Sequence, residues 1–352
     1  MPSKPFKRNG IGNPFMVVSN REPYVHRKAG HTIRVETPAG GLTSALDDAL
    51  SAKGGLWVAW GSGSADRETA DKKDCLRVPP KNPAYTLKRV WLHPRLVENY
   101  YNGYSNQVLW PLCHITLDRV SYRKKFWEAY QKVNLTFSRS VLEEVLSFPT
   151  IWIHDYHLCL LPGLLREKAP HLTLAHFWHI PWPDWSVFRI CPQAREILEG
   201  LLGNDLIGFQ IPLFGKNFMD CARECLNAEI EDNPPSVTYR GHKTHIKTFS
   251  IGVDFDKFNH LALQTRTIRL MSQLKKKHHF STYLGVGIDR LDYTKALIKR
   301  LQAIDLFFEK NRRYKSKVSF FQVAIPTRIQ EPYISYKSTV EQMIERINNR
   351  HS

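Results

Sequence analysis

The sequence has no long apolar run: its longest apolar stretches fall well short of the roughly 20 residues that a membrane span needs. The first thirteen residues are basic and polar, without the apolar core and the small-residue cleavage site of a secretory signal. We therefore expect no membrane segment, and we expect residues 1–13 to form a disordered basic tail.

Cysteine is scarce, and its spacing excludes the common structural roles. The six cysteines show no paired framework, and Cys221 and Cys225 lie four apart on a predicted helix, not at a zinc-knuckle spacing. His154, Asp155 and His157 follow a predicted strand, but no further histidine or cysteine completes a metal-binding pattern. The sequence thus predicts reduced thiols in a cytoplasmic protein, with no metal and no cofactor.

The sequence has few acidic residues: it contains 33 Asp and Glu and 50 Lys and Arg, which gives a net charge of +17. Such a charge favours polyanions, membranes or small anionic substrates. The basic runs Lys275–Lys277 and Arg312-Arg313 are short and lie between predicted elements, as solvated edges do, and no nucleic-acid module is present. We expect phosphorylated metabolites as partners, and neither nucleic acid nor a membrane.

The chain of 352 residues is long enough for two α/β domains with separate cores. From residue 151, short apolar runs alternate with amphipathic segments, which is typical of a parallel, doubly wound sheet. The predicted strands are 15–20, 57–60, 85–92, 151–154, 172–179, 205–210 and two within 236–251, and the predicted helices are 42–52, 122–147, 158–168, 194–202 and 212–226.

A domain boundary is expected near Asp254. The first Rossmann-like domain would then span 14–254 and the second 255–352. The second range has room for two strand and helix units, whereas a Rossmann-type domain usually has five or six strands. We therefore expect the second domain to be incomplete.

Three cations are predicted at strand ends of the second domain. Arg290 and Arg328 follow two buried strands, and Lys295 begins the helix between them. The two strands are expected at 280–286 and 318–324, and the helix at 296–309. Helix N-termini and the carboxyl edges of such sheets bind anions, so this arrangement suits phosphate chemistry. The alternative is that Arg290 and Lys295 form surface ion pairs with neighbouring aspartates.

Polar groups also follow the strands of the first domain. Arg21 comes after the first strand, Gly40-Gly41 precedes a helix as a second candidate phosphate cradle, and Asp155 and His179 follow later strands. Each has a structural alternative, since a Gly-Gly pair is often only a turn and a strand-terminal histidine is often structural. Together they predict one crevice at the carboxyl edge of the sheet, where Asp155 could bind sugar hydroxyls or act as an acid or base.

An aromatic segment, 100–112, is rich in tyrosine and tryptophan without the periodicity of a core helix. Aromatic faces stack on sugar rings, and phenol and indole groups donate hydrogen bonds to phosphates or hydroxyls. The alternative is an aromatic core beneath a loop. Both interpretations stay open for this segment and for Trp60, which ends its strand.

Seven motifs occur in the order found in one family. They are Ser19-Asn-Arg21, Gly40-Gly-Leu42, Tyr100-Tyr-Asn-Gly-Tyr-Ser-Asn-Gln-Val-Leu-Trp-Pro-Leu112, Ile153-His-Asp-Tyr-His157, His179-Ile-Pro-Trp-Pro183, Asp205-Leu-Ile-Gly-Phe-Gln210 and Asp289-Arg-Leu-Asp-Tyr-Thr-Lys295. From about Phe15 to Asn348 the chain resembles the trehalose-6-phosphate synthases, retaining glycosyltransferases of the GT-B fold with two Rossmann-like domains.

The resemblance implies transfer of glucose from UDP-glucose to glucose 6-phosphate with retention, without a metal or paired catalytic carboxylates. It implies that 14–254 is the acceptor domain and 255–352 the nucleotide-sugar donor domain. The acceptor-binding residues would be Arg21, Trp60, Tyr101, Trp110, Asp155 and Arg328. The donor-binding residues would be Gly41, His179, Arg290 and Lys295, and the catalytic residues would be Asp155, His179, Arg290 and Lys295.

The chain departs from the family pattern in three places. Lys295-Ala296 stands where the family usually has Lys-Gly, Ser186–Arg189 lacks the usual Glu, and an Asp-Gly-Met-Asn run with a downstream Glu is absent. An enzyme with another acceptor, such as a glucosylglycerol-phosphate synthase, and an inactive sugar-phosphate-binding or regulatory homologue therefore stay open. So do a homo-oligomer and a complementing subunit.

Overall fold

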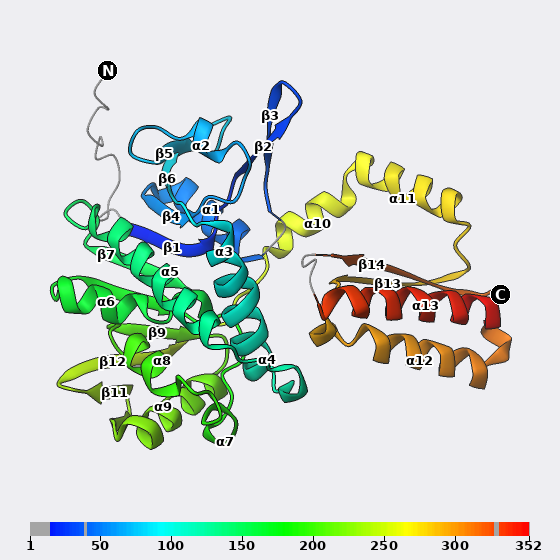
Figure 1. Cartoon of the computed structure of the whole chain (residues 1–352). Coiled ribbons are helices and arrows are strands. Elements are labelled where there is room, and N and C mark those ends of the chain that lie inside the picture. Colours follow the sequence, from blue (N-terminus) through cyan, green and yellow to red (C-terminus); the bar gives the residue numbers. More distant parts are fainter. Residues whose placement is uncertain (1–14, 39–40, 327–330, 352) are drawn as a thin grey trace. The chain divides into compact units, whose positions relative to one another are not determined.

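The computed structural model describes residues 15–38, 41–326 and 331–351, and the chain divides into two compact units, Met1–Ile251 and Gly252–Ser352 (Figure 1). No helix in these described ranges combines the length and the apolar character needed to cross a membrane. All six cysteines are free thiols.

The first unit is built on a ten-stranded sheet with the order β10-β11-β12-β9-β8-β7-β1-β4-β6-β5. The run from β12 to β6 is parallel, and the outer strands β5, β10 and β11 pair antiparallel. The strands are β1 Phe15–Arg21, β4 Leu56–Trp60, β5 Cys75–Val78, β6 Tyr85–Val90, β7 Thr150–His154, β8 Thr173–Phe177, β9 Leu206–Phe209, β10 Glu229–Asp232, β11 Pro235–Tyr239 and β12 His242–Thr248.

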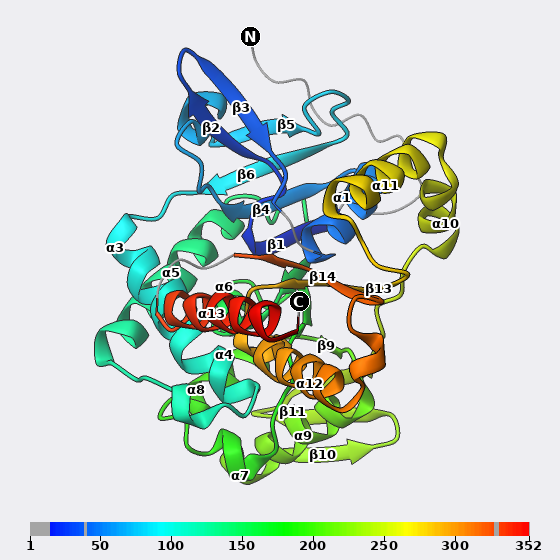
Figure 2. The ribbon, with the colours of Figure 1, turned by 90° about the vertical axis from the view of Figure 1, so that its right-hand side faces the viewer.

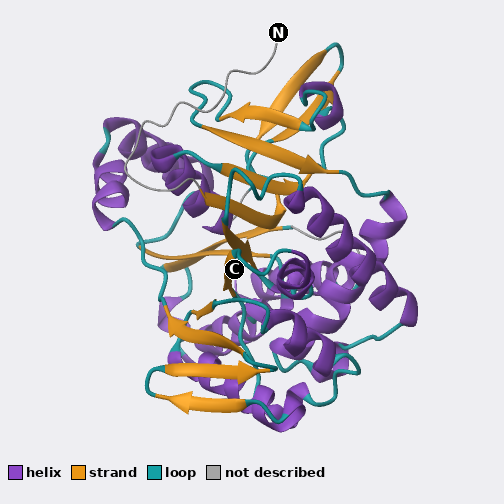
Figure 3. Ribbon diagram, turned by 90° about the vertical axis from the view of Figure 1, so that its left-hand side faces the viewer, coloured by secondary structure: helices purple, strands orange, loops and turns teal. Residues whose placement is uncertain are grey.

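Helices pack against this sheet (Figure 3), and α6 contacts both α5 and α8. The helices of the first unit are α1 Gly41–Lys53, α2 Asp66–Thr69, α3 Pro94–Val97, α4 Trp110–Cys113, α5 Lys124–Leu142, α6 Leu161–Lys168, α7 Trp185–Phe188, α8 Ala194–Leu201 and α9 Pro212–Leu226, with short 3₁₀ turns at Leu117–Arg119 and Tyr156–Leu158. Because both faces of a parallel sheet are buried, its central strands have apolar cores: Met16, Val17 and Val18 of β1 have no exposed surface.

The strand order reverses between β1 and β7. From β1 the sheet continues through β4 and β6 on one side and through β7, β8, β9 and β12 on the other. All these strands are parallel, so their carboxyl ends meet at one edge. Ligands of open α/β sheets bind outside this edge at the reversal point, which here lies between the ends of β1 and β7.

Two parts of the first unit were not among the predicted elements. The hairpin of β2 Val25–Ala29 and β3 Thr32–Glu36 stands out from the rest of the unit (Figure 2), and it was not predicted because its largely polar, exposed residues lack an apolar face. The segment Glu98–Leu109 is a π-helix, continued by α4. The sequence of this segment lacks the periodicity of an α-helix because a π-helix has hydrogen bonds between residues five apart and does not follow the 3.6-residue pattern.

The second unit contains the parallel pair β13 Tyr283–Arg290 and β14 Val318–Ile325, with α10 Phe255–Leu263, α11 Thr265–His278, α12 Leu297–Lys310 and α13 Tyr333–His351, and with 3₁₀ turns at Tyr293–Lys295 and Arg312–Tyr314. Its core includes Leu291, Leu297, Tyr336 and Val340. The expectation of a buried strand at 280–286 was wrong. The strand begins at Tyr283, and Val286 is 59% exposed because, within the described unit, one face of the pair is left open.

Ala296 has a left-handed backbone, with φ 53° and ψ 35°, between the 3₁₀ turn that ends at Lys295 and the start of α12. Its Cβ makes this conformation unfavourable for alanine, whereas glycine adopts it readily. The position where the chain departs from its family's usual glycine is therefore a strained junction next to a candidate phosphate-binding lysine.

Ala296→Gly is expected to stabilise the second unit by about 1 kcal/mol, because it removes the left-handed penalty. The same change at the exposed helical residue Ala303 should destabilise it by about 1 kcal/mol, since glycine is a poor helix former. Urea unfolding of both variants measures this contrast. Equal destabilisation by both changes would show that Ala296 is not strained.

Candidate active site

Arg21 ends β1, at the reversal point of the sheet, and two consecutive tyrosines of the π-helix contact this strand end. The Arg21 guanidinium donates a hydrogen bond of 2.6 Å to the Tyr101 hydroxyl and lies 5.8 Å from the centre of that ring. The Tyr100 hydroxyl donates a bond of 3.0 Å to Oδ1 of Asn20. The tyrosine pair therefore fixes the direction in which Arg21 leaves the sheet.

Aromatic rings extend from Tyr101 in two directions. Trp60, at the end of β4, has its ring centre 6.2 Å from that of Tyr101, and the His157 ring stacks on Tyr101 at 5.6 Å. Tyr156 stacks on His157 at 4.1 Å and lies 5.8 Å from Trp110. Trp110 is buried whereas Trp60 and Tyr101 are half-buried, so the aromatic segment both fills the core and reaches the carboxyl edge.

Asp155 follows β7 with an unusual backbone, φ 71° and ψ 172°. Such angles are essentially restricted to glycine, and a side chain there costs about 1–3 kcal/mol. Two hydrogen bonds hold the residue: its N–H donates to the carbonyl of Phe177 at 2.8 Å, and Nε2 of His176 lies 3.1 Å from its carbonyl oxygen. Its carboxylate lies 3.9 Å from Nδ1 of His157. Strain at a strand end beside a reversal point is typical of a functional residue.

Three histidines lie behind Asp155. Nδ1 of His154 is 3.1 Å from Nε2 of His179, so the two rings share one proton, and His176 lies on the neighbouring β8. Burial lowers the pKa of His179 to about 4 and that of His176 to about 3, and burial together with both neighbours lowers the pKa of His154. At neutral pH the three rings are uncharged, so His179 offers a hydrogen bond at this edge without a fixed charge.

The candidate phosphate-binding residues have different surroundings. Gly41 begins α1 of the first unit, and a Cβ there would meet no atom within 4 Å. Arg290 ends β13 and Lys295 ends the 3₁₀ turn before α12, both in the second unit. Asp289 forms an ion pair of 2.6 Å with Arg300, so it has a partner other than the two predicted cations. Gly40 and Arg328 lie outside the described residues.

Sequence reasoning missed the groups that support this edge. His176 holds the carbonyl of Asp155, and Glu22, Asp66 and Arg89 form a buried ionic cluster behind Arg21 and Trp60. Their partners are remote in the chain, since 67 residues separate Glu22 from Arg89. No local pattern could have identified them.

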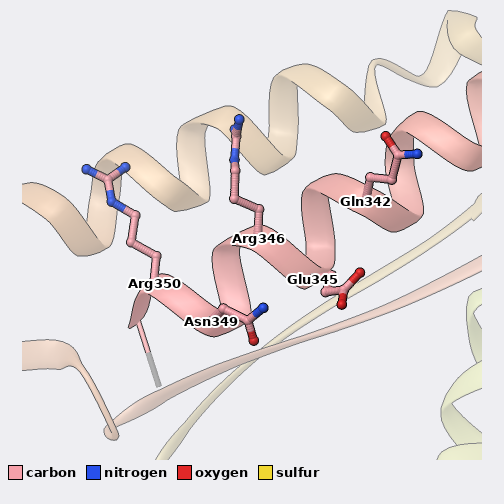
Figure 4. Close-up of a pocket in the computed structure, with 5 residues that line it drawn as sticks. All are labelled: Gln342, Glu345, Arg346, Asn349 and Arg350. Carbon is pink, nitrogen blue, oxygen red and sulfur yellow. The ribbon is translucent and has the colours of Figure 1, made fainter.

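A pocket elsewhere on the surface does not bear on this site. It lies on α13 and is lined by Gln342, Glu345, Arg346, Asn349 and Arg350, and none of these is a predicted substrate residue (Figure 4). Within the described parts of the chain, no group of three or more His, Cys, Asp or Glu side chains is arranged to hold a metal ion.

The neutral histidines predict how stability depends on pH. Because the folded pKa values of His176 and His179 lie below the unfolded value of about 6.5, unfolding takes up protons. Stability is complete above about pH 6.5 and falls as the pH drops toward 4. Thermal unfolding from pH 7 to 5 should show a falling Tm, and His176→Gln should make the decline shallower. A Tm that does not change over this range would contradict the assignment.

The sequence profile of glycosyltransferase family 20 matches residues 13–352. Among curated relatives, the alpha,alpha-trehalose-phosphate synthase [UDP-forming] A of Dictyostelium discoideum is 33% identical over 341 residues, covering 96% of this chain and 45% of the relative. The corresponding synthase of Pichia angusta is 32% identical over 348 residues, covering 95% and 72%. The chain thus spans less than half of the first relative and about seven-tenths of the second.

Solved structures of trehalose-phosphate synthases also match this chain. A trehalose-phosphate synthase from Burkholderia xenovorans in complex with glucose-6-phosphate matches with a TM-score of 0.82 and 28% identity, over 97% of this chain and 72% of the other. The Escherichia coli protein bound with UDP-2-fluoro glucose matches with a TM-score of 0.81 and 29% identity, over 97% and 71%. These matches confirm the resemblance and the GT-B type α/β fold expected from the motifs. The chain belongs to glycosyltransferase family 20.

Proposed function

We propose that this chain transfers glucose from UDP-glucose to glucose 6-phosphate with retention, giving α,α-trehalose 6-phosphate and UDP. The observation that carries the proposal is the group formed by Arg21, Tyr101 and Trp60 at the sheet's reversal point. It combines a fixed cation with aromatic faces, which is the chemistry that recognises a sugar phosphate. The relatives named as trehalose-phosphate synthases favour this reaction over the alternatives with another acceptor.

The acceptor would bind in the first unit. Arg21 would form charge-assisted hydrogen bonds with the phosphate, and Tyr101 and Trp60 would contact the sugar ring. Trp110 is buried and would act through the aromatic stack. The family resemblance also gives a phosphate-binding role to Arg328, which lies outside the described residues. Asp155 would accept hydrogen bonds from hydroxyl groups of the reacting sugars. The strained backbone of Asp155 favours this role because strain often accompanies a preorganised site.

The candidate donor residues suit a diphosphate in each unit taken by itself. Gly41, at the start of α1, leaves space for a diphosphate to approach backbone N–H groups, and helix N-termini attract such anions. Arg290 and Lys295 follow β13 and would neutralise the charge that develops on the departing diphosphate. Neutral His179 would donate a hydrogen bond to the transferred sugar. The leaving phosphate itself would take the acceptor proton, so the scheme assigns no separate carboxylate base.

The direct test is release of UDP from UDP-glucose by the purified chain, with glucose 6-phosphate or glycerol 3-phosphate as acceptor. Turnover with glucose 6-phosphate that forms a non-reducing phosphorylated disaccharide would support the proposal. Turnover only with glycerol 3-phosphate would assign another acceptor. Failure of the chain to bind either phosphate in calorimetry would reject a sugar-phosphate transferase.

Arg21→Ala is expected to weaken binding of glucose 6-phosphate by roughly ten- to a hundredfold, because a charge-assisted bond contributes about 1.5–3 kcal/mol. Arg27→Ala is the matched control: Arg27 is an exposed arginine of β2 that pairs with Glu36, and its loss should leave the affinity unchanged. Isothermal titration calorimetry compares the two. An unchanged Kd for Arg21→Ala would remove this residue from the site.

Lys295→Ala is expected to lower kcat by about a hundredfold or more, because the lysine would stabilise charge that appears only in the transition state. Lys299→Ala removes the same charge from an exposed position of α12 and should have little effect. Steady-state kinetics with varied UDP-glucose separates the parameters. A change confined to KM would mean that Lys295 binds ground state and transition state equally.

A further inference from the structure

A segment of buried residues connects β1 to β2, immediately after Arg21. Every residue from Glu22 to His26 is buried, although the segment contains a glutamate and a histidine. Buried ionisable groups are costly unless they are paired, so Glu22 and His26 are expected to have specific partners. Asp66 of α2 and Arg89 of β6 supply the partners.

Arg89 lies at the centre of this cluster and is 1% exposed. Its Nε is 2.9 Å from Oε2 of Glu22, and its Nη2 is 2.9 Å from Oδ1 of Asp66. Its remaining N–H groups donate to the carbonyl of Asp66 at 2.8 Å, to the hydroxyl of Thr69 at 2.8 Å and to the carbonyl of Tyr24 at 3.0 Å. A guanidinium with this many partners is rigid, and it fixes the carboxyl group of Glu22.

The other oxygen of Glu22 reaches the turn after β4. Its Oε1 accepts hydrogen bonds from the backbone N–H of Ser62 at 2.8 Å and from the Ser62 hydroxyl at 3.0 Å. The N–H of Gly63 donates to Oδ2 of Asp66 at 2.5 Å. A Cβ on Gly63 would lie 2.2 Å from the carbonyl oxygen of His26, so this turn packs closely on β2. Trp60 lies two residues before Ser62, at the end of β4.

The same segment also contacts the helix that begins at Gly41. The Tyr24 hydroxyl donates a bond of 2.7 Å to Asp47 of α1, and the Tyr85 hydroxyl donates to the other oxygen of that carboxylate. Tyr24 further accepts from Arg89 through its carbonyl. Three elements with candidate substrate residues, the ends of β1 and β4 and the helix α1, are therefore tied to one buried segment.

The cluster contains two carboxyl groups for the one guanidinium. Burial, together with the hydrogen bond to Asp66 and its charge, raises the pKa of Glu22 to about 8. Burial alone would raise the pKa of Asp66, but hydrogen bonds from His26, Glu22 and Gly63 outweigh it and lower that pKa. Asp66 is therefore the carboxylate that balances Arg89, and Glu22 is largely protonated at pH 7.

We propose that Glu22 is a positioning residue of the acceptor site, whose carboxyl group joins the strand end that carries Arg21 to the turn that follows Trp60. The proposal rests on the proposed function, because it assigns Arg21 and Trp60 to the same ligand, glucose 6-phosphate. Glu22 itself is 2% exposed and does not contact the ligand. It acts by fixing the distance between the Arg21 guanidinium and the Trp60 ring.

The test compares Glu22→Ala and Glu22→Gln in the full chain. Removing the carboxyl group should raise the Kd for glucose 6-phosphate by about tenfold, since small displacements of binding groups are expensive. Glutamine keeps an oxygen for Ser62 and a donor for Asp66 and loses only the acceptor facing Arg89, so its Kd should rise by no more than about threefold. Calorimetry at pH 7 measures both.

The matched control is Thr244→Val, at a fully buried threonine of β12, remote from β1 in the strand order, which donates to the carbonyls of Leu202 and Asn204. It should lower the Tm as the Glu22 variants do but leave the Kd unchanged. Hydrogen exchange gives a readout without ligand: the Ser62 amide should exchange faster in Glu22→Ala and not in Thr244→Val.

A pH series gives a second, independent criterion. The groups facing Glu22 are Asp66 on α2, Arg89 on β6, His26 on β2 and the neutral Ser62. Ionisation of Glu22 as the pH rises from 7 to 9 adds a second buried negative charge beside Asp66. The Kd of the unaltered protein should therefore rise over this range, and that of Glu22→Gln should stay constant.

The outcomes separate the two proposals. If the unaltered protein does not bind glucose 6-phosphate, the proposed function fails, and the role of Glu22 fails with it. If it binds and the Glu22 variants match Thr244→Val in Kd, pH dependence and Ser62 exchange, the cluster only stabilises the fold and the positioning role is overturned.

Discussion

The constraint on which the candidate site depends is the parallel direction of the central strands. Because β4, β1, β7 and β8 all run the same way, their final residues meet at one edge, and this edge carries Trp60, Arg21, Asp155 and His179. The strand order reverses between β1 and β7, and open α/β sheets bind their ligands outside the carboxyl edge at such a point. The residue at the end of each strand therefore determines the chemistry of this edge, and the parallel sheet brings these residues close together.

Sequence patterns predicted the elements whose signals are local. Helix α9 was expected at 212–226 and has those bounds, because Pro212 suits its first turn and Asn227 adopts the left-handed conformation that ends it. The strands after residue 150 were recognised as short apolar runs between turns. Helix α5 follows its predicted apolar spacing but ends at Leu142. The turns from 143 to 147 lie just before Pro149, whose ring disfavours helical backbone in the preceding residue.

Long-range relations could not be predicted in this way. The motifs identified Arg21 and Tyr101 separately, but the bond between them spans 80 residues and requires a π-helix that no 3.6-residue pattern reveals. The support from His176 and Arg89 has no sequence signal, since an isolated histidine or arginine within a strand is usually structural. In the second unit the positions of Arg290 and Lys295 at a strand end and a helix start follow the prediction, whereas the burial of β13 does not. The assignment of substrates to the two units remains a prediction.

The backbone of Asp155 has a consequence for how this position can evolve. Glycine would relax the local angles and add thermal stability, so random change under selection for stability alone would tend to replace the aspartate. Under the proposed function, contacts of the carboxylate with the reacting sugars would outweigh this strain and keep an aspartate at the position. Position 155 would then be one where selection for folding and selection for catalysis act in opposite directions, and its identity would report on whether a lineage still uses the site.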